Sequence, residues 1–324
     1  MKKMFWMLGV AVAAMTSCTN DEVMEMNQNN VIKFENFVNK GTRVASTTID
    51  NLTNFYVFGY YDINTNVLSN VEVSKSGEYE TNVPWTNNQT YQFAAYATNN
   101  STTKFDDANF ADRKLTFSGY NVTDDKDLVI AYATDHQAGS DVPLIFRHKL
   151  SKIKFTLTNA SVDGLLMTVS NITFKLKQKG DYNSSSVNEW TISSDATEET
   201  LTFNGTDQDK YLSTTGENSH TTGEHLVLPQ KLGEITASFT ASFYDSNKTL
   251  VQTVSYSDVK LGGDIYTGST DEYWKPGYIY NYTAQLPVSP TYIKFTVSSI
   301  ENWQEGQGDS GNATVNGSQG NIGF

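Results

Sequence analysis

Cysteine is nearly absent from this chain of 324 residues, which contains Cys18 alone. No disulfide can form within one chain, so the stability of the fold must come from packing. Basic residues are also few, with 23 Lys and Arg against 36 Asp and Glu, a net charge of −13. Because the basic residues are scattered and form no stripe, we expect no nucleic-acid binding, and the acidity favours a soluble, exposed surface.

A catalytic or metal-binding constellation is absent as well. The chain has four histidines. His220 and His225 lack the spacing of the zinc helix motif, and no serine elbow is present. The acidic turns at 124–127 and 204–209 do not follow the EF-hand spacing and are expected to be solvated. His148 ends an apolar strand, where we expect a hydrogen-bonded structural histidine. The sequence therefore predicts no catalytic residue, no metal and no cofactor. A pair of carboxylates of the glycosidase type leaves no local pattern, because its two members are distant in sequence.

Long apolar runs are limited to the N-terminus. Lys2 and Lys3 precede the uncharged run Met4–Met15, which is too short to span a membrane with normal flanks. This pattern predicts a signal peptide over residues 1–17. Met15–Cys18 resembles a bacterial lipobox, in which the cysteine becomes an acylated N-terminus, for example with palmitate. Each buried lipid methylene contributes about 0.8 kcal/mol to membrane binding, so an acylated Cys18 is expected to hold the protein on the outer membrane. The alternative is that Cys18 is a buried free thiol.

What the sequence does have is alternation with a period of two, which recurs from end to end. Helical periodicity of apolar residues is absent, and turn-forming pairs such as Asn204-Gly205 separate the alternating segments. The alternating apolar positions include Ile153, Phe155, Leu157; Ile172, Phe174, Leu176; Ile235, Ala237, Phe239, Ala241, Phe243; and Ile293, Phe295, Val297. The pattern predicts an all-β chain of sandwich type.

The composition divides the chain into five predicted segments. About 300 residues follow the signal peptide, enough for two domains. The predicted limits are the signal peptide 1–17, an acidic tether 18–30, an N-terminal β-sandwich 31–142, a C-terminal β-sandwich 143–303 and a Gly/Asn-rich tail 304–324.

Several short motifs occur in a fixed order. Pro276-Gly277 is a turn signal, because Pro fixes φ and Gly accepts a positive φ. Tyr278, Tyr280 and Tyr282 then share one face of a strand. The motif segments are Asp127–Ala131 (DLVIA), Leu144–Phe155 (LIFRHKLSKIKF, similar to F-x-H-x-L-S-K-[VI]-x-F), Leu226–Gln230 (LVLPQ), Trp274–Tyr282 (WKPGYIYNY, matching W-x-P-G-x-x-Y-x-Y), and Ile293–Phe295 with Trp303. Together they resemble the fimbrillin family, the type V pilins and their surface-lipoprotein relatives.

The resemblance implies both a fold and a role. Family members have two tandem transthyretin-like β-sandwich domains, so we expect that architecture here. They are structural or adhesive subunits of Gram-negative bacteria, which implies a surface location on the outer membrane or in a fimbrium. The implied partners are other fimbrial subunits and a host or bacterial surface ligand.

The segment 31–46 carries the processing expected from the resemblance. Residues 31–37 alternate as a strand, and 39–46 is a polar loop with a lone arginine. In the family a protease cuts after an arginine at the corresponding place and releases the first strand. Arg43 is therefore the candidate cleavage residue and Val44 the new N-terminus; the alternative is an arginine in an ordinary exposed loop. The apolar residues of the released strand would be Val31, Ile32, Phe34 and Phe37.

The C-terminal tail departs from the family pattern. The family donates a C-terminal strand to a neighbouring subunit, whereas apolar residues are scattered in 304–324 and its glycines weaken a strand. The candidate donor residues are Val315, Ile322 and Phe324. The tail leaves open a stalk subunit, a tip-like subunit and a surface lipoprotein that does not polymerise. For the last of these, Trp85 and Trp190 could stack on sugar rings or else fill a core.

Overall fold

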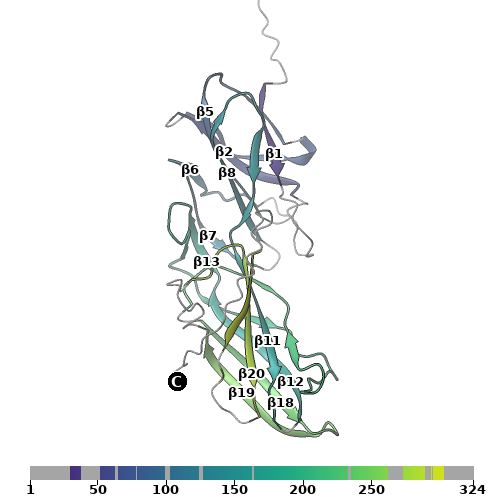
Figure 1. The fold of residues 1–324 in the computed structure, drawn as a ribbon. Helices are drawn as coiled ribbons and strands as arrows, with labels where there is room; N and C mark the ends of the chain where they lie inside the picture. The colour runs from purple at the N-terminus through teal and green to yellow at the C-terminus, as the bar shows by residue number, and fades with distance from the viewer. Residues whose placement is uncertain are drawn as a thin grey trace, which may run out of the picture. The chain divides into compact units, whose positions relative to one another are not determined.

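The computed structural model describes residues 30–37, 52–62, 65–77, 79–98, 103–123, 127–162, 164–232, 235–261, 273–288, 293 and 295–302. The strands from Val31 onward belong to one compact unit, and the description concerns that unit (Figure 1). Apart from one short 3₁₀ turn at Lys75–Gly77, its described regular elements are β-strands. The predicted all-β class is thus confirmed.

The strands nearest the N-terminus are built around one five-stranded sheet. Its strand order is β10-β8-β5-β2-β3. The members are β2 (Asn54–Tyr61), β3 (Thr65–Ser74), β5 (Thr90–Thr98), β8 (Leu128–Gln137) and β10 (Arg147–His148). Nearly every residue of β2 and β5 is buried, which requires that both faces of this sheet are covered.

Two smaller sheets cover those faces. One has the order β4-β1-β9 and consists of β1 (Val31–Phe37), β4 (Glu80–Pro84) and β9 (Val142–Ile145). The other has the order β14-β13-β7-β6 and consists of β6 (Asn109–Ala111), β7 (Lys114–Asn121), β13 (Lys179–Asn183) and β14 (Trp190–Ile192). A separate hydrophobic cluster fills the space on each side of the five-stranded sheet.

The second of these covering sheets joins residues from both sides of the predicted boundary at residue 142. Strand β13 pairs with β7 in antiparallel register, with Tyr182 opposite Phe117. Their rings stack with centroids 5.0 Å apart, so the 179–192 hairpin contributes to the core of the preceding sheet. The alternation of apolar residues marks strands but not their partners, which is why the sequence did not indicate this exchange. The segment limits given above stay predictions.

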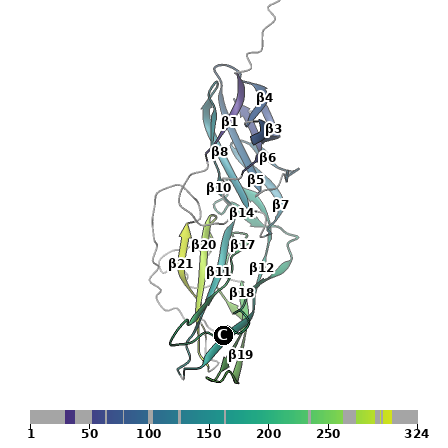
Figure 2. The same cartoon turned by 90° about the vertical axis from the view of Figure 1, so that its right-hand side faces the viewer.

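The remaining strands form a second sandwich. One sheet has the order β16-β11-β20-β21, with β17 also paired to β11, and the other has the order β15-β12-β18-β19. The first contains β11 (Ser151–Asn159), β16 (Ser219–Thr221), β17 (His225–Val227), β20 (Tyr278–Leu286) and β21 (Thr296–Asn302). The second contains β12 (Leu166–Lys177), β15 (Glu198–Phe203), β18 (Thr236–Tyr244) and β19 (Leu250–Lys260). Figure 2 shows β11, β20 and β21 side by side, β11 and β20 being parallel.

The apolar positions predicted from alternation are the core of this second sandwich. Ile153, Phe155 and Leu157 are at most 1% exposed, and the other alternating positions are buried with them. The predicted turn at Pro276-Gly277 is present, and Gly277 has a φ of 78°. The sandwich pattern is confirmed, whereas the transthyretin-like detail stays a prediction.

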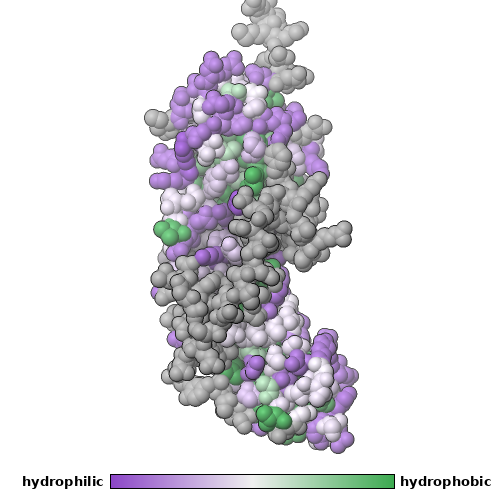
Figure 3. Space-filling view, viewed as in Figure 1, coloured by the Kyte–Doolittle hydropathy of each residue, from purple (hydrophilic) through white to green (hydrophobic). Residues whose placement is uncertain are grey.

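The surface is mainly polar. In the view of Figure 3, hydrophobic residues appear as separate small patches among hydrophilic ones. The exposed large hydrophobic side chains of the described residues are Val71, Ile145, Val162, Val187, Leu250 and Val251. Scattered exposure of this kind is ordinary for a soluble surface.

A tyrosine of β5 links stability to alkaline pH. Burial raises the pKa of Tyr96 from its ordinary value of 10.0 to about 12. Its hydroxyl donates to Asn70 Oδ1 at 2.7 Å and accepts from the backbone N–H of Phe105 at 3.0 Å. Because the folded pKa is raised, the contribution of Tyr96 to stability is fully present below about pH 10 and is lost as the pH approaches 12.

We therefore expect Tyr96→Phe to reduce the loss of stability at alkaline pH. The variant removes the titrating proton, so its free energy of unfolding should fall less between pH 10 and 12 than that of the unmodified chain. At pH 7 it should be less stable, because Asn70 and Phe105 each lose a hydrogen bond. Urea unfolding across the pH range measures both effects. Equal alkaline slopes for the two proteins would contradict the assignment.

Candidate functional site

The first strand occupies the centre of a sheet. Strand β1 pairs antiparallel with β4 on one side and parallel with β9 on the other, and Figure 2 shows it beside β4. Val31 lies opposite Pro84, and Phe34 lies opposite Val142. A strand so placed satisfies the backbone donors and acceptors along one edge of each neighbour. Its removal would leave two strand edges facing an open groove.

Side chains of β1 reach into the core beneath it. Ile32 is 0% exposed and Phe34 is 1% exposed. The Phe34 ring meets Phe55 of β2 and Phe93 of β5 edge to face, with centroids 5.8 and 5.4 Å apart. This strand is therefore part of the cluster that covers one face of the five-stranded sheet.

Polar contacts fix the register of β1 against β4. The hydroxyl of Thr81 donates to the carbonyl oxygen of Ile32 at 2.9 Å, and both residues are buried. At the surface, Lys33 Nζ lies 3.2 Å from Glu80 Oε1. The buried hydrogen bond is the stronger constraint, because an exposed ion pair of this kind contributes about 0–1 kcal/mol.

The structure can be compared with the residues predicted for the released strand. Ile32 and Phe34 are buried as the alternation predicts, and Val31 is half-buried. Phe37 lies in the strand, but its side chain is outside the described part. Two fully buried side chains are thus established here. The lipidation residue Cys18, the cleavage residues Arg43 and Val44, and the tail residues Val315, Ile322 and Phe324 all lie outside the described residues, so these assignments stay predictions.

The motif segments found in the sequence contact one another. The hydroxyl of Ser151 donates to the carbonyl oxygen of Lys275 at 2.9 Å. The N–H of Gly277 donates to the carbonyl oxygen of Leu150 at 2.7 Å. The turn at Pro276-Gly277 is therefore attached to the start of β11, which explains why the two motifs occur together.

A buried polar pair joins two further motif segments. His148 Nδ1 lies 2.5 Å from Asp127 Oδ2, and both side chains are 3% exposed. The prediction that His148 is hydrogen-bonded structure is confirmed. The expectation that the acidic turn at 124–127 is solvated is wrong for Asp127, which is 2% exposed. The sequence did not indicate this pairing, because the three residues before Asp127 resemble an ordinary acidic turn. Nearby, burial lowers the pKa of Lys152, and the carboxylates of Glu224 and Asp127 oppose that shift.

The other candidate binding residues have structural partners. His220 Nε2 is 2.9 Å from the carbonyl oxygen of Asn204, and His225 Nε2 is 3.1 Å from that of Thr202. Over the described ranges, no three His, Cys, Asp or Glu side chains gather in a way that could hold a metal. The same part of the chain contains no helix with the length and hydropathy of a membrane span.

The two tryptophans considered for sugar stacking are core residues. Trp85 is 7% exposed, packs edge to face on Tyr91 and stacks on His136. Trp190 is 5% exposed, and its indole N–H donates to the carbonyl oxygen of Lys149 at 2.7 Å. The hypothesis that either ring stacks on a sugar at the surface is therefore wrong, because both rings are buried and pack against other residues of the core.

Comparisons with known proteins find similarity to fimbrial and cell adhesion proteins. A model of the fimbrillin-like family matches residues 42–303. A crystal structure of a fimbrial protein from Bacteroides vulgatus superposes with a TM-score of 0.58 at 16% identity, covering 85% of this chain and 100% of that one. A candidate cell adhesion protein from Parabacteroides distasonis superposes with a TM-score of 0.52 at 12% identity, covering 85% and 96%. At such identities the superpositions show a shared fold. A search of curated proteins gave no match.

Proposed function

The chain belongs to the fimbrillin-like family, and we propose that it is a fimbrial subunit of a Gram-negative bacterium that assembles by strand exchange. Membership of this family makes it a fimbrial or adhesin-like surface protein and not an enzyme. The finer proposal has three parts: export as a lipoprotein acylated at Cys18, cleavage after Arg43, and pairing with other fimbrial subunits. Anchoring in the outer membrane would follow from the lipid.

The position of β1 carries this proposal. It is the middle strand of β4-β1-β9, and it is joined to the rest of the chain by a segment that contains Arg43. The family match begins at residue 42, so β1 lies outside the matched range. In this proposal Cys18 is the N-terminus of the exported protein, so β1 is joined to the other strands only through the segment that contains Arg43. One cut after Arg43 would therefore release it.

The energetics make such a vacancy a strong driving force. Each of the two buried side chains, Ile32 and Phe34, contributes about 1.5–3 kcal/mol, or about 3–6 kcal/mol together. A domain is stable by only about 5–15 kcal/mol, so loss of β1 removes a large share. A strand from another subunit would restore both the apolar contacts and the pairing of β4 and β9. This is recognition by β-strand addition.

Arginine-specific proteolysis of the purified chain tests the proposal. We expect a cut product that begins at Val44, loses the 31–37 peptide and melts at a lower temperature or forms multimers, because its groove is open. Mass spectrometry identifies the new terminus, and size-exclusion chromatography reports assembly. Arg43→Lys is the matched control, since it keeps the positive charge but removes the site.

Arg113 and Arg147 are the other arginines outside the predicted signal peptide, and cleavage there would confuse the result. Arg113→Lys and Arg147→Lys in the same background remove that ambiguity. A product that keeps β1, or that remains monomeric with unchanged melting, would count against strand exchange.

A second candidate is a surface lipoprotein that binds carbohydrate without polymerising. The sequence of the tail favours it, because glycines separate Val315, Ile322 and Phe324 and weaken a donor strand. Acylated Cys18 at the N-terminus of protein taken from cells would support this candidate. Val44 at that terminus would support the processed subunit.

A further inference from the structure

Two residues at the start of β4 hold the backbone of β1. The N–H of Phe34 donates to the carbonyl oxygen of Tyr79, which lies just before β4, at 3.0 Å. The hydroxyl of Thr81 donates to the carbonyl oxygen of Ile32 at 2.9 Å. Every strand carries N–H and C=O groups, whatever its side chains. Both contacts are therefore available to a strand of another subunit as well as to β1.

Tyr79 has an unusual backbone conformation. Its φ of 59° lies in the left-handed region. Among the described residues, eight of the twelve non-glycine residues with positive φ are Asn or Asp, which tolerate that region, and Tyr79 is the only aromatic one. Its hydroxyl donates to the carbonyl oxygen of Leu52 at 2.9 Å, and its ring stacks on Phe55 with centroids 5.7 Å apart. Its N–H donates to the carbonyl oxygen of Ser74 at 2.9 Å, so Tyr79 offers β1 its carbonyl group alone.

The hydroxyl of Thr81 is likewise restricted to one role. Thr81 is buried, and its oxygen accepts from the N–H of Val83 at 3.2 Å, so its proton is directed to Ile32. The pairing of β1 with β4 shifts register between Val31 and Lys33, and the hydroxyl bonds to β1 within that irregular stretch. A buried donor without an acceptor lowers stability. A strand in this groove must therefore present a C=O group at this point.

The other contacts of the groove give little preference for the direction of the strand. Strand β1 is antiparallel to β4 and parallel to β9, so a reversed strand would exchange the two kinds of pairing and keep similar ladders. Two large side chains with one residue between them face the core in either direction. However, reversal exchanges the positions of the N–H and C=O groups along the strand. Only the correct direction satisfies Tyr79 and Thr81 together.

We propose that Tyr79 and Thr81 are positioning residues that set the direction of any strand in this groove. A strand from another subunit then enters running as β1 does, antiparallel to β4 and parallel to β9. The partner that fits is an extended segment with two large apolar residues separated by one residue. It needs an N–H at the second apolar position, which excludes proline there. The inference rests on the proposed strand exchange and adds the orientation of the incoming strand.

Peptide exchange measures the preference for direction. The chain with Arg113→Lys and Arg147→Lys is cut after Arg43 and, while it still holds its own β1, is mixed with an excess of a fluorescent peptide. The peptide is either Val31–Phe37 (VIKFENF) or its reverse (FNEFKIV), which in the opposite direction places the same side chains in the groove but exchanges the backbone groups. We expect VIKFENF to bind about ten-fold more tightly, as measured by fluorescence anisotropy.

Matched variants assign this preference to the two residues. Thr81→Val removes the hydroxyl, and Thr81→Ser keeps it. Tyr79→Val and Tyr79→Asn both remove the ring, but only Asn tolerates the left-handed region. We expect the preference for VIKFENF to fall to about three-fold or less in each valine variant and to persist in the Ser and Asn variants.

Hydrogen exchange of the uncut chain gives a second readout. The amide of Phe34 should exchange about ten-fold faster in Tyr79→Val than in Tyr79→Asn, because only the latter keeps the carbonyl group in place. Equal rates in these two variants, or a preference that survives both valine variants, would overturn the inference.

The outcomes also separate the inference from strand exchange. Entry of both peptides with equal affinity would overturn the inference and leave strand exchange standing. Entry of neither peptide would count against strand exchange itself, and the amide of Phe34 would then decide whether Tyr79 positions β1.

Discussion

Phe34→Ala is expected to lower the free energy of unfolding by about 3–5 kcal/mol. The ring is 1% exposed and meets Phe55 and Phe93 at centroid distances of 5.8 and 5.4 Å. Truncation leaves a cavity beneath β1 that these rings cannot easily fill, because they are themselves held by the five-stranded sheet. Urea unfolding of the uncut chain measures the loss.

The same variant also tests how strongly β1 is held in its groove after cleavage. After cleavage at Arg43, the peptide that carries Phe34→Ala should leave the groove faster than the unmodified peptide. Lys33→Ala is the matched control, since its ion pair with Glu80 is exposed and should contribute at most about 1 kcal/mol. A loss below about 1 kcal/mol for Phe34→Ala would show that β1 is not a stabilising part of this core.

His148→Leu is expected to destabilise the chain by about 3–5 kcal/mol. The substitution removes the ring that lies 2.5 Å from Asp127 Oδ2, while the carboxylate stays buried. The other oxygen of Asp127 already has no hydrogen-bond partner within the described residues. A buried carboxylate that loses its partner carries its full desolvation cost.

A double variant distinguishes this explanation from a simple packing defect. Replacing both partners, Asp127→Leu with His148→Leu, removes the buried polar groups together and should recover most of the stability. Glu224 remains beside Lys152 in that variant, so the lysine keeps a carboxylate neighbour. If the two single effects simply add in the double variant, the pair is not coupled and the assignment is wrong.

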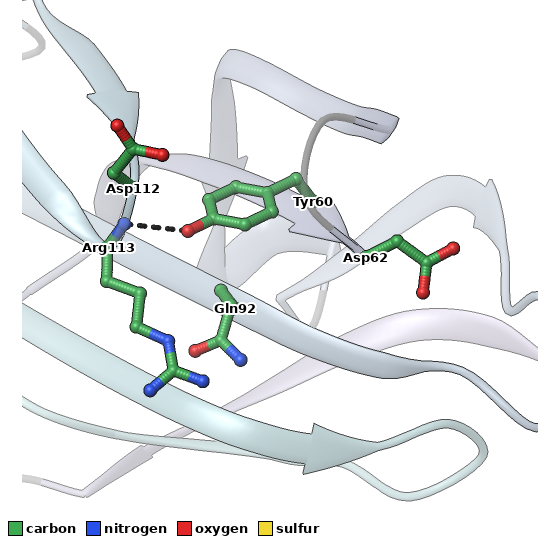
Figure 4. A pocket seen from close by; sticks show the side chains of 5 residues that line it. All are labelled: Tyr60, Asp62, Gln92, Asp112 and Arg113. Atoms are coloured by element: carbon green, nitrogen blue, oxygen red, sulfur yellow. Dashed lines mark hydrogen bonds between the residues drawn. The ribbon is translucent and has the colours of Figure 1, made fainter.

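The sequence already indicated a structural role for the residues in both predictions, Phe34 and His148. Phe34 was expected to be buried because it alternates with Ile32, and this needs only the two-residue period of a strand. His148 was expected to be structural, but its partner Asp127 lies 21 positions earlier and belongs to a segment that looks like a solvated turn. The open pocket that Tyr60, Gln92 and Arg113 help to line was not expected at all (Figure 4), since these residues have no common spacing in the sequence.

The sequence by itself determined that the chain is all-β, which positions face the cores, and where turns such as Pro276-Gly277 occur. These properties are local, because side-chain alternation and turn chemistry act over a few residues. Only the tertiary structure decided that β1 lies between β4 and β9, that the 179–192 hairpin joins β7, and that an open pocket forms near Tyr60. Backbone hydrogen bonds between strands are nearly the same for any sequence, so packing across distant segments selects the partners.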